Sequence, residues 1–295
     1  VLAHDFLRRR AGWTGIALEG VNYDAARGWL RRRLKPHTAI VDFLYHPQAH
    51  FWADHHATTF LGASVRAHRQ RRNRSRWLVY DVTAPSCAQL LQQHLERAFG
   101  HRTHAFDELV AWATKIDSAD YATPSEAMSM DSPALRISLS LAANGPGGFP
   151  EQLVALLLER DLAAVARHPE VARRADRAWK RLQVGLDRLK ASAEMAGDIV
   201  VFDVHAAKAA VPRYGPYLFF PDAKYSVGVV RSKGEAKVTA MRNPWRTFES
   251  VPLGGVMARH GGGGHHRVAS VVLKGPRARN ASDVLRAVVD EIGRR

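Results

Sequence analysis

Three adjacent side chains with acid–base and metal-binding chemistry, Asp54, His55 and His56, follow the apolar residues FWA. Successive side chains of an extended chain point to opposite sides, so the two imidazoles cannot face the same way. One imidazole can therefore ligate a metal ion while the other reaches a substrate. A His-His pair alone is more often an ordinary surface or core feature than a functional site. Whether this pair belongs to a site therefore depends on the residues near it.

Further carboxylates stand near the predicted ends of strands and helices. Asp42 ends the apolar run TAIVD, 12 residues before Asp54, and open α/β sheets bind ligands at the carboxyl ends of their strands. Asp117 and Asp120 are three residues apart, a spacing that puts both on one face if the stretch is helical. The alternatives are a helix cap or loop anchor for Asp42 and a solvated helix end for Asp120.

Carboxylates mixed with imidazoles favour a borderline-hard divalent ion such as Mn²⁺, with Mg²⁺ as the alternative. A thiolate zinc site is excluded, because the only cysteine is Cys87, which we expect to be a core residue in a reducing cytoplasm. Divalent ions polarise a phosphoryl oxygen and acidify water, so that hydroxide attacks phosphorus. A bridging carboxylate holds two such ions about 3.5–4 Å apart, and Asp42 is the candidate for that bridge.

A second pattern lies near the C-terminus, where Gly261–Gly264 precede His265, His266 and Arg267. Glycines let backbone N–H groups approach a ligand closely, and successive amides can form an anion-binding concavity. His265 and Arg267 add donors and positive charge, so the pattern predicts a phosphate-binding loop. The alternative is a flexible glycine-rich loop, which the apolar segment RVASVVL directly behind it disfavours.

The segments that must position these residues alternate between short apolar runs and helical patterns. Buried strands are predicted at 38–45 and 76–82 and helices at 1–12, 85–100 and 106–121, which favours a parallel sheet covered by helices. A break rich in Gly and Pro at 144–150 precedes a helical stretch with an interruption at His168-Pro169. Short strands, among them YLFF and KVTAM, follow from residue 197, before a last helix with Ser282 as its N-cap.

We therefore predict an α/β chain with two domains. An N-terminal domain with a parallel sheet spans 1–145, a helical connector spans 146–196, and a smaller C-terminal α/β domain spans 197–295. Such a chain has no run of about 18 apolar residues, so we expect neither a membrane-spanning helix nor a membrane partner.

The charge balance favours an anionic partner. Lys and Arg number 43 and Asp and Glu 28, a net charge of +15, which attracts nucleic acid, nucleotides or polyphosphate. The alternative is that arginine simply serves as the solubilising cation. In the same way, the Arg-rich run AHRQRRNRSRW is interpreted as a solvated loop rather than as an anion contact.

Taken together, these motifs resemble those of the DHH phosphoesterase family. The resemblance covers nearly the whole chain: VDF (41–43), ADHH (53–56) and KIDSAD (115–120) resemble the DHH domain, and GGGGHHRVAS (261–270) resembles the DHH-associated domain. Compact members of the family are nanoRNases, which also act on pAp, and RecJ-type exonucleases and cyclic-dinucleotide phosphodiesterases share the core. The resemblance implies a manganese-dependent phosphoesterase with two metal ions that acts on short oligonucleotides or small nucleotides.

The resemblance also implies roles in the N-terminal domain. Asp42 matches the aspartate that bridges two metal ions, and His55 and Asp117 match metal ligands. His56 matches the histidine that faces the substrate phosphate and can act as an acid, and Asp54 would orient a ligand or the loop.

In the C-terminal domain the resemblance implies a substrate-binding role for Gly262, Gly263, Gly264 and His265. The family places an arginine on a strand upstream of this loop, and Arg242 in KVTAMRNPW fits that position better than Arg231. Near Arg242, Trp245 is a candidate for base stacking, with a place in the core as the alternative.

One departure from the family pattern is serious, because the first family motif, a histidine followed by two aspartates, has no match in the sequence. We expect it upstream of Val1. Without it the alternative is a catalytically impaired nucleotide- or nucleic-acid-binding protein. A pyrophosphatase or exopolyphosphatase is a further alternative, although the Gly-rich loop argues mildly against a pyrophosphatase. The expected partner is an anionic nucleotide or short oligonucleotide, and a homodimer is left open.

Overall fold

The computed structural model describes residues 1–21, 23–143, 147–207 and 209–294. Its internal contacts divide the chain into two compact units, the first comprising Val1–Asp120 and Asn144–His168 and the second Tyr121–Ala143 and Pro169–Arg295. The helices of the expected connector at 146–196 are thus divided between the units at His168-Pro169. The expected Gly/Pro break at 144–150 lies partly outside the described residues.

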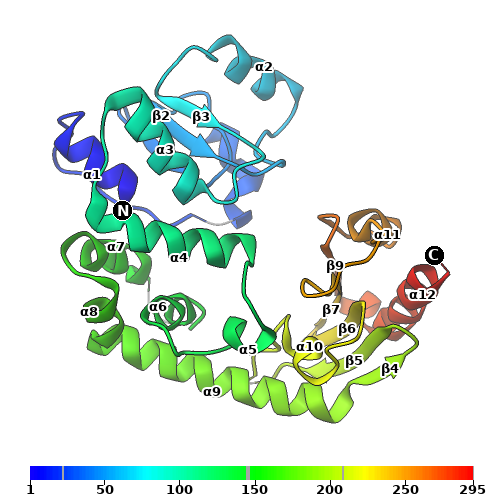
Figure 1. Cartoon of the computed structure of the whole chain (residues 1–295). Helices are drawn as coiled ribbons and strands as arrows, with labels where there is room; N and C mark the ends of the chain where they lie inside the picture. Colours follow the sequence, from blue (N-terminus) through cyan, green and yellow to red (C-terminus); the bar gives the residue numbers. More distant parts are fainter. Residues whose placement is uncertain (22, 144–146, 208, 295) are drawn as a thin grey trace. The chain divides into compact units, whose positions relative to one another are not determined.

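The first unit contains a parallel sheet with the strand order β1-β2-β3, formed by β1 (Ala39–Val41), β2 (Phe51–Asp54) and β3 (Leu78–Tyr80) (Figure 1). Side chains alternate along β2: Phe51 and Ala53 pack with helices α1 (Leu2–Arg9) and α3 (Cys87–Phe99), whereas Trp52 packs with Trp29 and Val65 on the other face. Both faces are therefore covered, as is usual for parallel strands. The predicted parallel sheet is confirmed, although its strands are shorter than the apolar runs at 38–45 and 76–82.

The helices and 3₁₀-helices of this unit are α1 (Leu2–Arg9), η1 (Tyr23–Arg31), α2 (Ala63–Arg71), α3 (Cys87–Phe99), η2 (His104–Phe106), α4 (Asp107–Ser118), α7 (Phe149–Glu159) and α8 (Leu162–Arg167). Helix α3 shows why the sequence predicted it well. Ser86 caps its N-terminus by accepting a hydrogen bond from the Gln89 N–H at 3.0 Å, and Gly100 ends it with φ 60°. Cys87 is buried at its first turn, as expected for a core residue.

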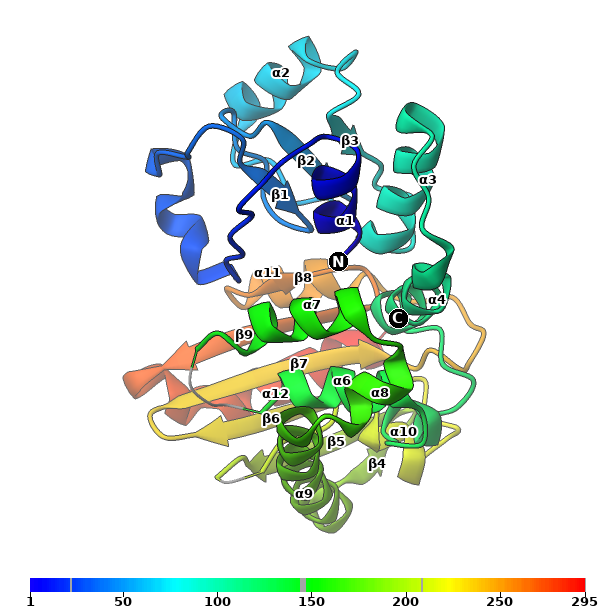
Figure 2. The same ribbon diagram turned by 90° about the vertical axis from the view of Figure 1, so that its left-hand side faces the viewer.

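The second unit is built on a mixed sheet with the order β4-β5-β6-β7-β9-β8. Its strands are β4 (Glu194–Ala196), β5 (Ile199–His205), β6 (Tyr225–Ser232), β7 (Glu235–Arg242), β8 (Gly263–Gly264) and β9 (Val268–Lys274). Figure 2 shows β5, β6, β7 and β9 side by side. Strands β5 and β6 are parallel, and the other pairs are antiparallel.

The helices of this unit are α5 (Pro124–Ala127), α6 (Pro133–Leu141), α9 (Pro169–Ser192), α10 (Gly215–Phe219), α11 (Leu253–Arg259), η3 (Gly275–Asn280) and α12 (Ala281–Gly293). Residues of α11 and α12 form one core with β6, β7 and β9, and Leu189 of α9 packs on Phe202 and Val204 of β5. No helix in the described part of the chain combines the length and apolar character that a bilayer crossing requires.

Two local predictions in this unit are wrong. The run YLFF is not a strand but part of α10, because a short apolar run does not distinguish the two; the Tyr217 hydroxyl there is buried and donates to the Met241 carbonyl at 2.6 Å. Ser282 is not the N-cap of the last helix, since Asn280 holds that position. The Ser282 hydroxyl instead accepts a hydrogen bond from Arg231 at 2.8 Å.

Candidate metal centre

The structure brings the acidic and imidazole side chains of the DHH pattern together at the C-terminal edge of the parallel sheet. Asp42 directly follows β1, and Asp54 is the last residue of β2. Asp42 has φ 58°, a left-handed conformation that Asp tolerates better than most residues. Its N–H donates to the Ala53 carbonyl at 2.9 Å, which fixes the turn against the neighbouring strand.

His55 is held by a contact at each ring nitrogen. Nδ1 lies 3.0 Å from the Ala84 carbonyl, and since a carbonyl only accepts, Nδ1 carries the proton. Nε2 therefore faces the carboxylates, 3.2 Å from Asp117 Oδ2 and 3.6 Å from Asp42 Oδ1. The interaction with Asp117 raises the pKa of His55 to about 9, against an opposing effect of burial.

Asp54 is a buried carboxylate that organises the two histidines. Its Oδ1 accepts hydrogen bonds from the His55 N–H at 2.8 Å and from Nδ1 of His56 at 2.8 Å. Its Oδ2 is buried and has no hydrogen-bond partner among the described residues. These two hydrogen bonds connect Asp54 to the backbone of His55 and to the side chain of His56.

Asp42 lies between the two imidazoles, with Oδ1 3.6 Å from His55 Nε2 and 3.7 Å from His56 Nδ1. Ligand atoms of Asp42, His55 and His56 all lie within 4.8 Å of one another. Desolvation of the carboxylate raises the pKa of Asp42, the nearby charge of Asp117 acts in the same direction, and the two histidines oppose it. The negative charges of Asp42 and Asp117, close to imidazole nitrogens that can bind a metal ion, favour a cation at this position.

The residues present fit a divalent metal ion. They offer carboxylate oxygens and imidazole nitrogens, the donor set that Mn²⁺ accepts and that excludes a thiolate-selective metal. The buried Asp54 Oδ2 without a hydrogen-bond partner among the described residues is unusual for an interior polar atom, and a cation nearby would compensate it. Asp42, His55 and His56 form the cluster of mutually close ligand atoms, and Asp117 Oδ2 lies 3.2 Å from His55 Nε2.

Asp120 does not share the site. Helix α4 ends at Ser118, and Ala119 turns the chain with φ 57°, so Asp120 lies beyond the helix rather than on the same face as Asp117. The expected alternative of a helix end applies to Asp120.

Sequence reasoning missed two contacts at this site. The Ala84 carbonyl fixes His55, and the Tyr80 hydroxyl donates to the His56 carbonyl at 3.3 Å. A backbone carbonyl has no residue-type signature, so no pattern could reveal Ala84. Tyr80 ends β3, and its place at the same sheet edge as Asp54 was the available signal.

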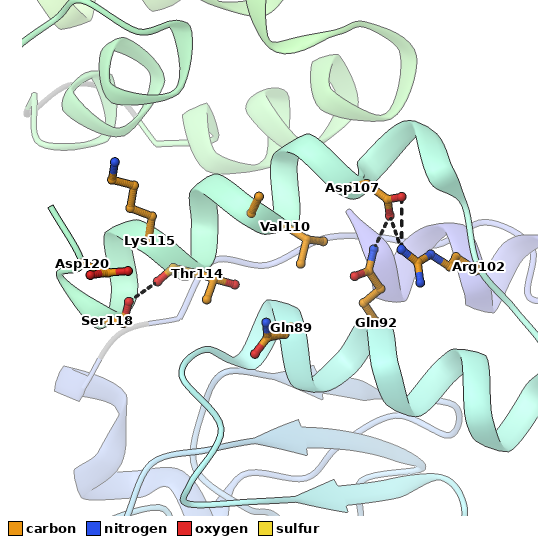
Figure 3. Close-up of a pocket in the computed structure, with 10 residues that line it drawn as sticks. Gln89, Gln92, Arg102, Asp107, Val110, Thr114, Lys115, Ser118 and Asp120 are labelled. Atoms are coloured by element: carbon orange, nitrogen blue, oxygen red, sulfur yellow. Dashed lines mark hydrogen bonds and ion pairs between the residues drawn. The ribbon is translucent and has the colours of Figure 1, made fainter. Parts of the chain in front are cut away.

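A polar pocket of about 460 Å³ lies along the helices α3 and α4 of the first unit (Figure 3). It does not contain Asp42, His55 or His56. Amide, hydroxyl and charged side chains dominate its lining, which comprises Gln89, Gln92, Arg102, Asp107, Val110, Ala111, Thr114, Lys115, Ser118 and Asp120. Asp107 accepts hydrogen bonds from Gln92 and Arg102, so the charges of Asp107 and Arg102 neutralise each other at one end of the pocket.

The glycine-rich loop of the second unit has a packing reason for its composition. A Cβ at Gly262 would lie 2.4 Å from the Ser270 carbonyl oxygen, and a Cβ at Gly264 would lie 2.5 Å from Ala269 Cα. A Cβ at Gly263 would meet no atom within 4 Å. Close pairing with β9, which the apolar segment behind the loop provides, therefore requires glycine at two positions.

The same loop ends in exposed, basic side chains. His265, His266 and Arg267 are exposed, whereas the amides of Gly261, Gly262 and His265 already donate to backbone carbonyls of the chain. The donors available to an anion are thus the side chains at the tip rather than those three amides.

Arg242 lies beside this loop, since its N–H donates to the Arg267 carbonyl at 2.9 Å. Its guanidinium donates to the carbonyls of Asn243 and Arg246 at 3.0 and 2.8 Å and stacks on Phe248. Arg231, the other candidate, is instead bound to Asp203 at 2.7 Å.

Trp245 is packed within the second unit. Its Nε1–H donates to the Tyr121 carbonyl at 2.8 Å, and its ring lies against Tyr214 and Tyr217. These contacts correspond to the core alternative rather than to a free stacking platform.

Comparisons with known proteins place the fold. No protein-family model matches the sequence, and no curated protein matches it either. Among solved structures, the chain is similar to the pGpG-specific phosphodiesterase PggH from Vibrio cholerae, with a TM-score of 0.70 at 16% identity over 94% of this chain and 90% of that chain. An exopolyphosphatase-related protein from Bacteroides fragilis has a TM-score of 0.47 at 11% identity over 97% of this chain and 80% of that chain. The likeness to PggH confirms the two-sheet α/β fold that the resemblance to DHH phosphoesterases implies.

Proposed function

We propose that the protein is a DHH-type, divalent-metal-dependent phosphoesterase that hydrolyses phosphodiester or phosphomonoester bonds of short oligonucleotides or small nucleotides. The observation that carries the proposal is the convergence of Asp42, His55 and Asp117 with the buried Asp54–His56 pair at one edge of the sheet. The shared fold with a pGpG-specific phosphodiesterase supports a dinucleotide as the first substrate to test.

We assign the side chains of this site to metal binding and to proton donation. Asp42, His55 and Asp117 hold the cation, with His55 turned toward the carboxylates through its bond to the Ala84 carbonyl. His56 is fixed at Nδ1 by Asp54, which leaves Nε2 to hold a proton at the substrate and release it to the leaving oxygen.

The proposed cofactor is Mn²⁺, two ions per chain, with Mg²⁺ as the alternative. The chemistry that such ions supply is Lewis acidity, which polarises a phosphoryl oxygen and makes water acidic enough to attack near neutral pH. Asp42 is proposed as the ligand that the two ions share, as the resemblance to DHH phosphoesterases implies, and its Oδ1 lies 3.6 Å from Nε2 of the proposed ligand His55.

Substrate phosphate binding is assigned to the loop at Gly262–His265 and to the neighbouring Arg242. The exposed cationic tip of the loop supports this assignment, and the net charge of +15 suits an anionic substrate. We further propose a cytoplasmic location, from the single cysteine.

The proposal is tested by a hydrolysis screen on the full chain with and without Mn²⁺. The substrates are linear dinucleotides including pGpG, pAp, cyclic dinucleotides, pyrophosphate and polyphosphate. We expect metal-dependent release of mononucleotides or phosphate from a nucleotide substrate. Equal rates with and without the metal would overturn the proposal, and activity confined to pyrophosphate or polyphosphate would replace the substrate class.

A further inference from the structure

A second surface of the first unit lies at the opposite edge of the parallel sheet, where the strands begin. Three chain segments, one before each strand, bring cationic and aromatic side chains to this edge, and Trp13, from the segment after α1, contacts His37 and His50 there. We call it the strand-start surface and define it by Trp13, Arg31, Arg33, Lys35, His37, His50, Arg71, Arg74, Arg76 and Trp77.

The three segments are tied together by hydrogen bonds. Arg72 donates to the carbonyls of Pro47 and Ala49, both at 3.3 Å, and the Leu34 N–H donates to the side chain of Gln48 at 2.9 Å. The segments before β1 and β3 thus flank the same loop before β2, so their exposed cations share one edge of the sheet.

No carboxylate in the described part of the chain neutralises the arginines that follow α2. Residues 55–80 contain six arginines and no Asp or Glu. Within the described residues, no carboxylate forms an ion pair with Arg71, Arg74 or Arg76, whereas Arg102 and Arg231 are bound to carboxylates.

The arginines divide by role. Arg69 and Arg72 donate to backbone carbonyls and support the local structure. Arg71 and Arg74 are exposed and have no contact of this kind among the described residues, so their guanidinium groups are available to an external anion.

Four aromatic rings form a cluster at the same edge, in which Trp13 contacts both histidines. His37 lies 5.4 Å from Trp13 and 5.1 Å from His50, and His50 lies 5.0 Å from Trp77, measured between ring centroids. His37 is exposed and the other three are half-buried. Cationic side chains together with aromatic rings are the combination that binds single-stranded nucleic acid, through phosphate contacts and base stacking.

We propose that the strand-start surface binds the backbone and bases of single-stranded nucleic acid. It lies at the opposite end of the strands from the candidate metal centre, because His50 directly precedes β2 and Asp54 ends it, a separation of about 13 Å at about 3.3 Å per residue. Binding there needs no metal ion and stands independently of the proposed hydrolysis.

The test measures binding of a fluorescent single-stranded oligonucleotide to the full chain in EDTA, which also prevents hydrolysis. Arg71→Gln combined with Arg74→Gln should weaken binding about tenfold and reduce the slope of log K against log salt by about 1.4, for two lost phosphate contacts. The control is Arg167→Gln combined with Arg177→Gln, which removes the same charge from exposed arginines on α8 and α9 and should change binding less than about twofold.

A second variant tests whether the aromatic cluster contributes to binding. His37 has φ 58°, so His37→Asn keeps a residue that tolerates this conformation and removes the ring. Loss of one stacked base should weaken binding about fivefold or more. Unchanged melting temperatures of the variants exclude unfolding as the cause.

Equal losses in the Arg71/Arg74 variant and the Arg167/Arg177 control would overturn the proposal, because net charge alone would then explain binding. The same variants are also tested for binding to vesicles of anionic lipid. If the Arg71/Arg74 variant loses vesicle binding but still binds the oligonucleotide like the wild-type chain, the proposal is overturned and the surface binds membranes instead. A binding loss confined to the Arg71/Arg74 and His37 variants supports it, even if the screen of the proposed enzymatic function finds no hydrolysis.

Discussion

Asp54 Oδ1 lies 2.8 Å from Nδ1 of His56 and holds that imidazole in one tautomer. The carboxylate is 1% exposed, so the bond is shielded from water and the ring orientation is set before any substrate arrives. Nε2 of His56 is therefore the nitrogen that remains for substrate chemistry.

Replacing the Asp54 carboxylate should therefore impair proton donation by His56 to the leaving oxygen more than it impairs substrate binding. We expect Asp54→Asn to lower kcat about 10- to 100-fold with a smaller change in KM. The control is Asp187→Asn on α9, an exposed carboxylate. An Asp54→Asn variant that raises KM and leaves kcat unchanged would contradict this role.

Metal binding should compete with a proton on His55. Asp117 raises the pKa of His55 to about 9, so at pH 7 the imidazole of the metal-free protein carries a proton on Nε2 as well as on Nδ1. The Nε2 proton must be released when a metal ion binds there. We expect about one proton released per chain at pH 7, and an apparent Mn²⁺ affinity that rises about tenfold per pH unit until pH approaches 9.

Calorimetry in two buffers of different ionisation enthalpy measures this proton. The variant His55→Gln should abolish the release. If the wild-type protein binds Mn²⁺ without releasing a proton, His55 is not a ligand.

The glycine-rich loop allows packing and ligand roles to be separated. Gly262→Ala should destabilise the protein by about 1–3 kcal/mol, because the new Cβ would lie 2.4 Å from the Ser270 carbonyl oxygen. Gly263→Ala is the matched control, since its Cβ meets no atom within 4 Å. Chemical denaturation monitors both variants, and equal stabilities would contradict the packing argument.

Gly263→Ala also tests the substrate role of the loop. If the loop binds the substrate phosphate, this variant raises KM while its stability stays at the wild-type level. An unchanged KM would remove the loop from substrate binding.

Much of the metal centre was predictable, because strand ends and residue types are local properties. Asp42 follows an apolar run, and Asp54 with its two histidines follows another, so parallel pairing of the two strands places them at one edge. The caps of α3 were equally readable, since Ser86 and Gly100 act through neighbouring backbone groups.

Other features depend on distant parts of the chain. The Ala84 carbonyl that fixes His55 is 29 residues away in sequence and has no residue-type signature. YLFF lies largely in helix α10, where the Tyr217 hydroxyl donates to the Met241 carbonyl on β7, 24 residues away in sequence. The packing role of Gly262 is visible only once β9 lies beside it.

The most direct test of the central claim is Mn²⁺-dependent hydrolysis of a linear dinucleotide by the wild-type chain and by His55→Ala. If Asp42, His55 and Asp117 hold the catalytic ions, the wild-type rate should depend on Mn²⁺ and His55→Ala should reduce it at least about 100-fold at limiting metal. A His55→Ala variant that folds and hydrolyses the dinucleotide at the wild-type rate would contradict the account.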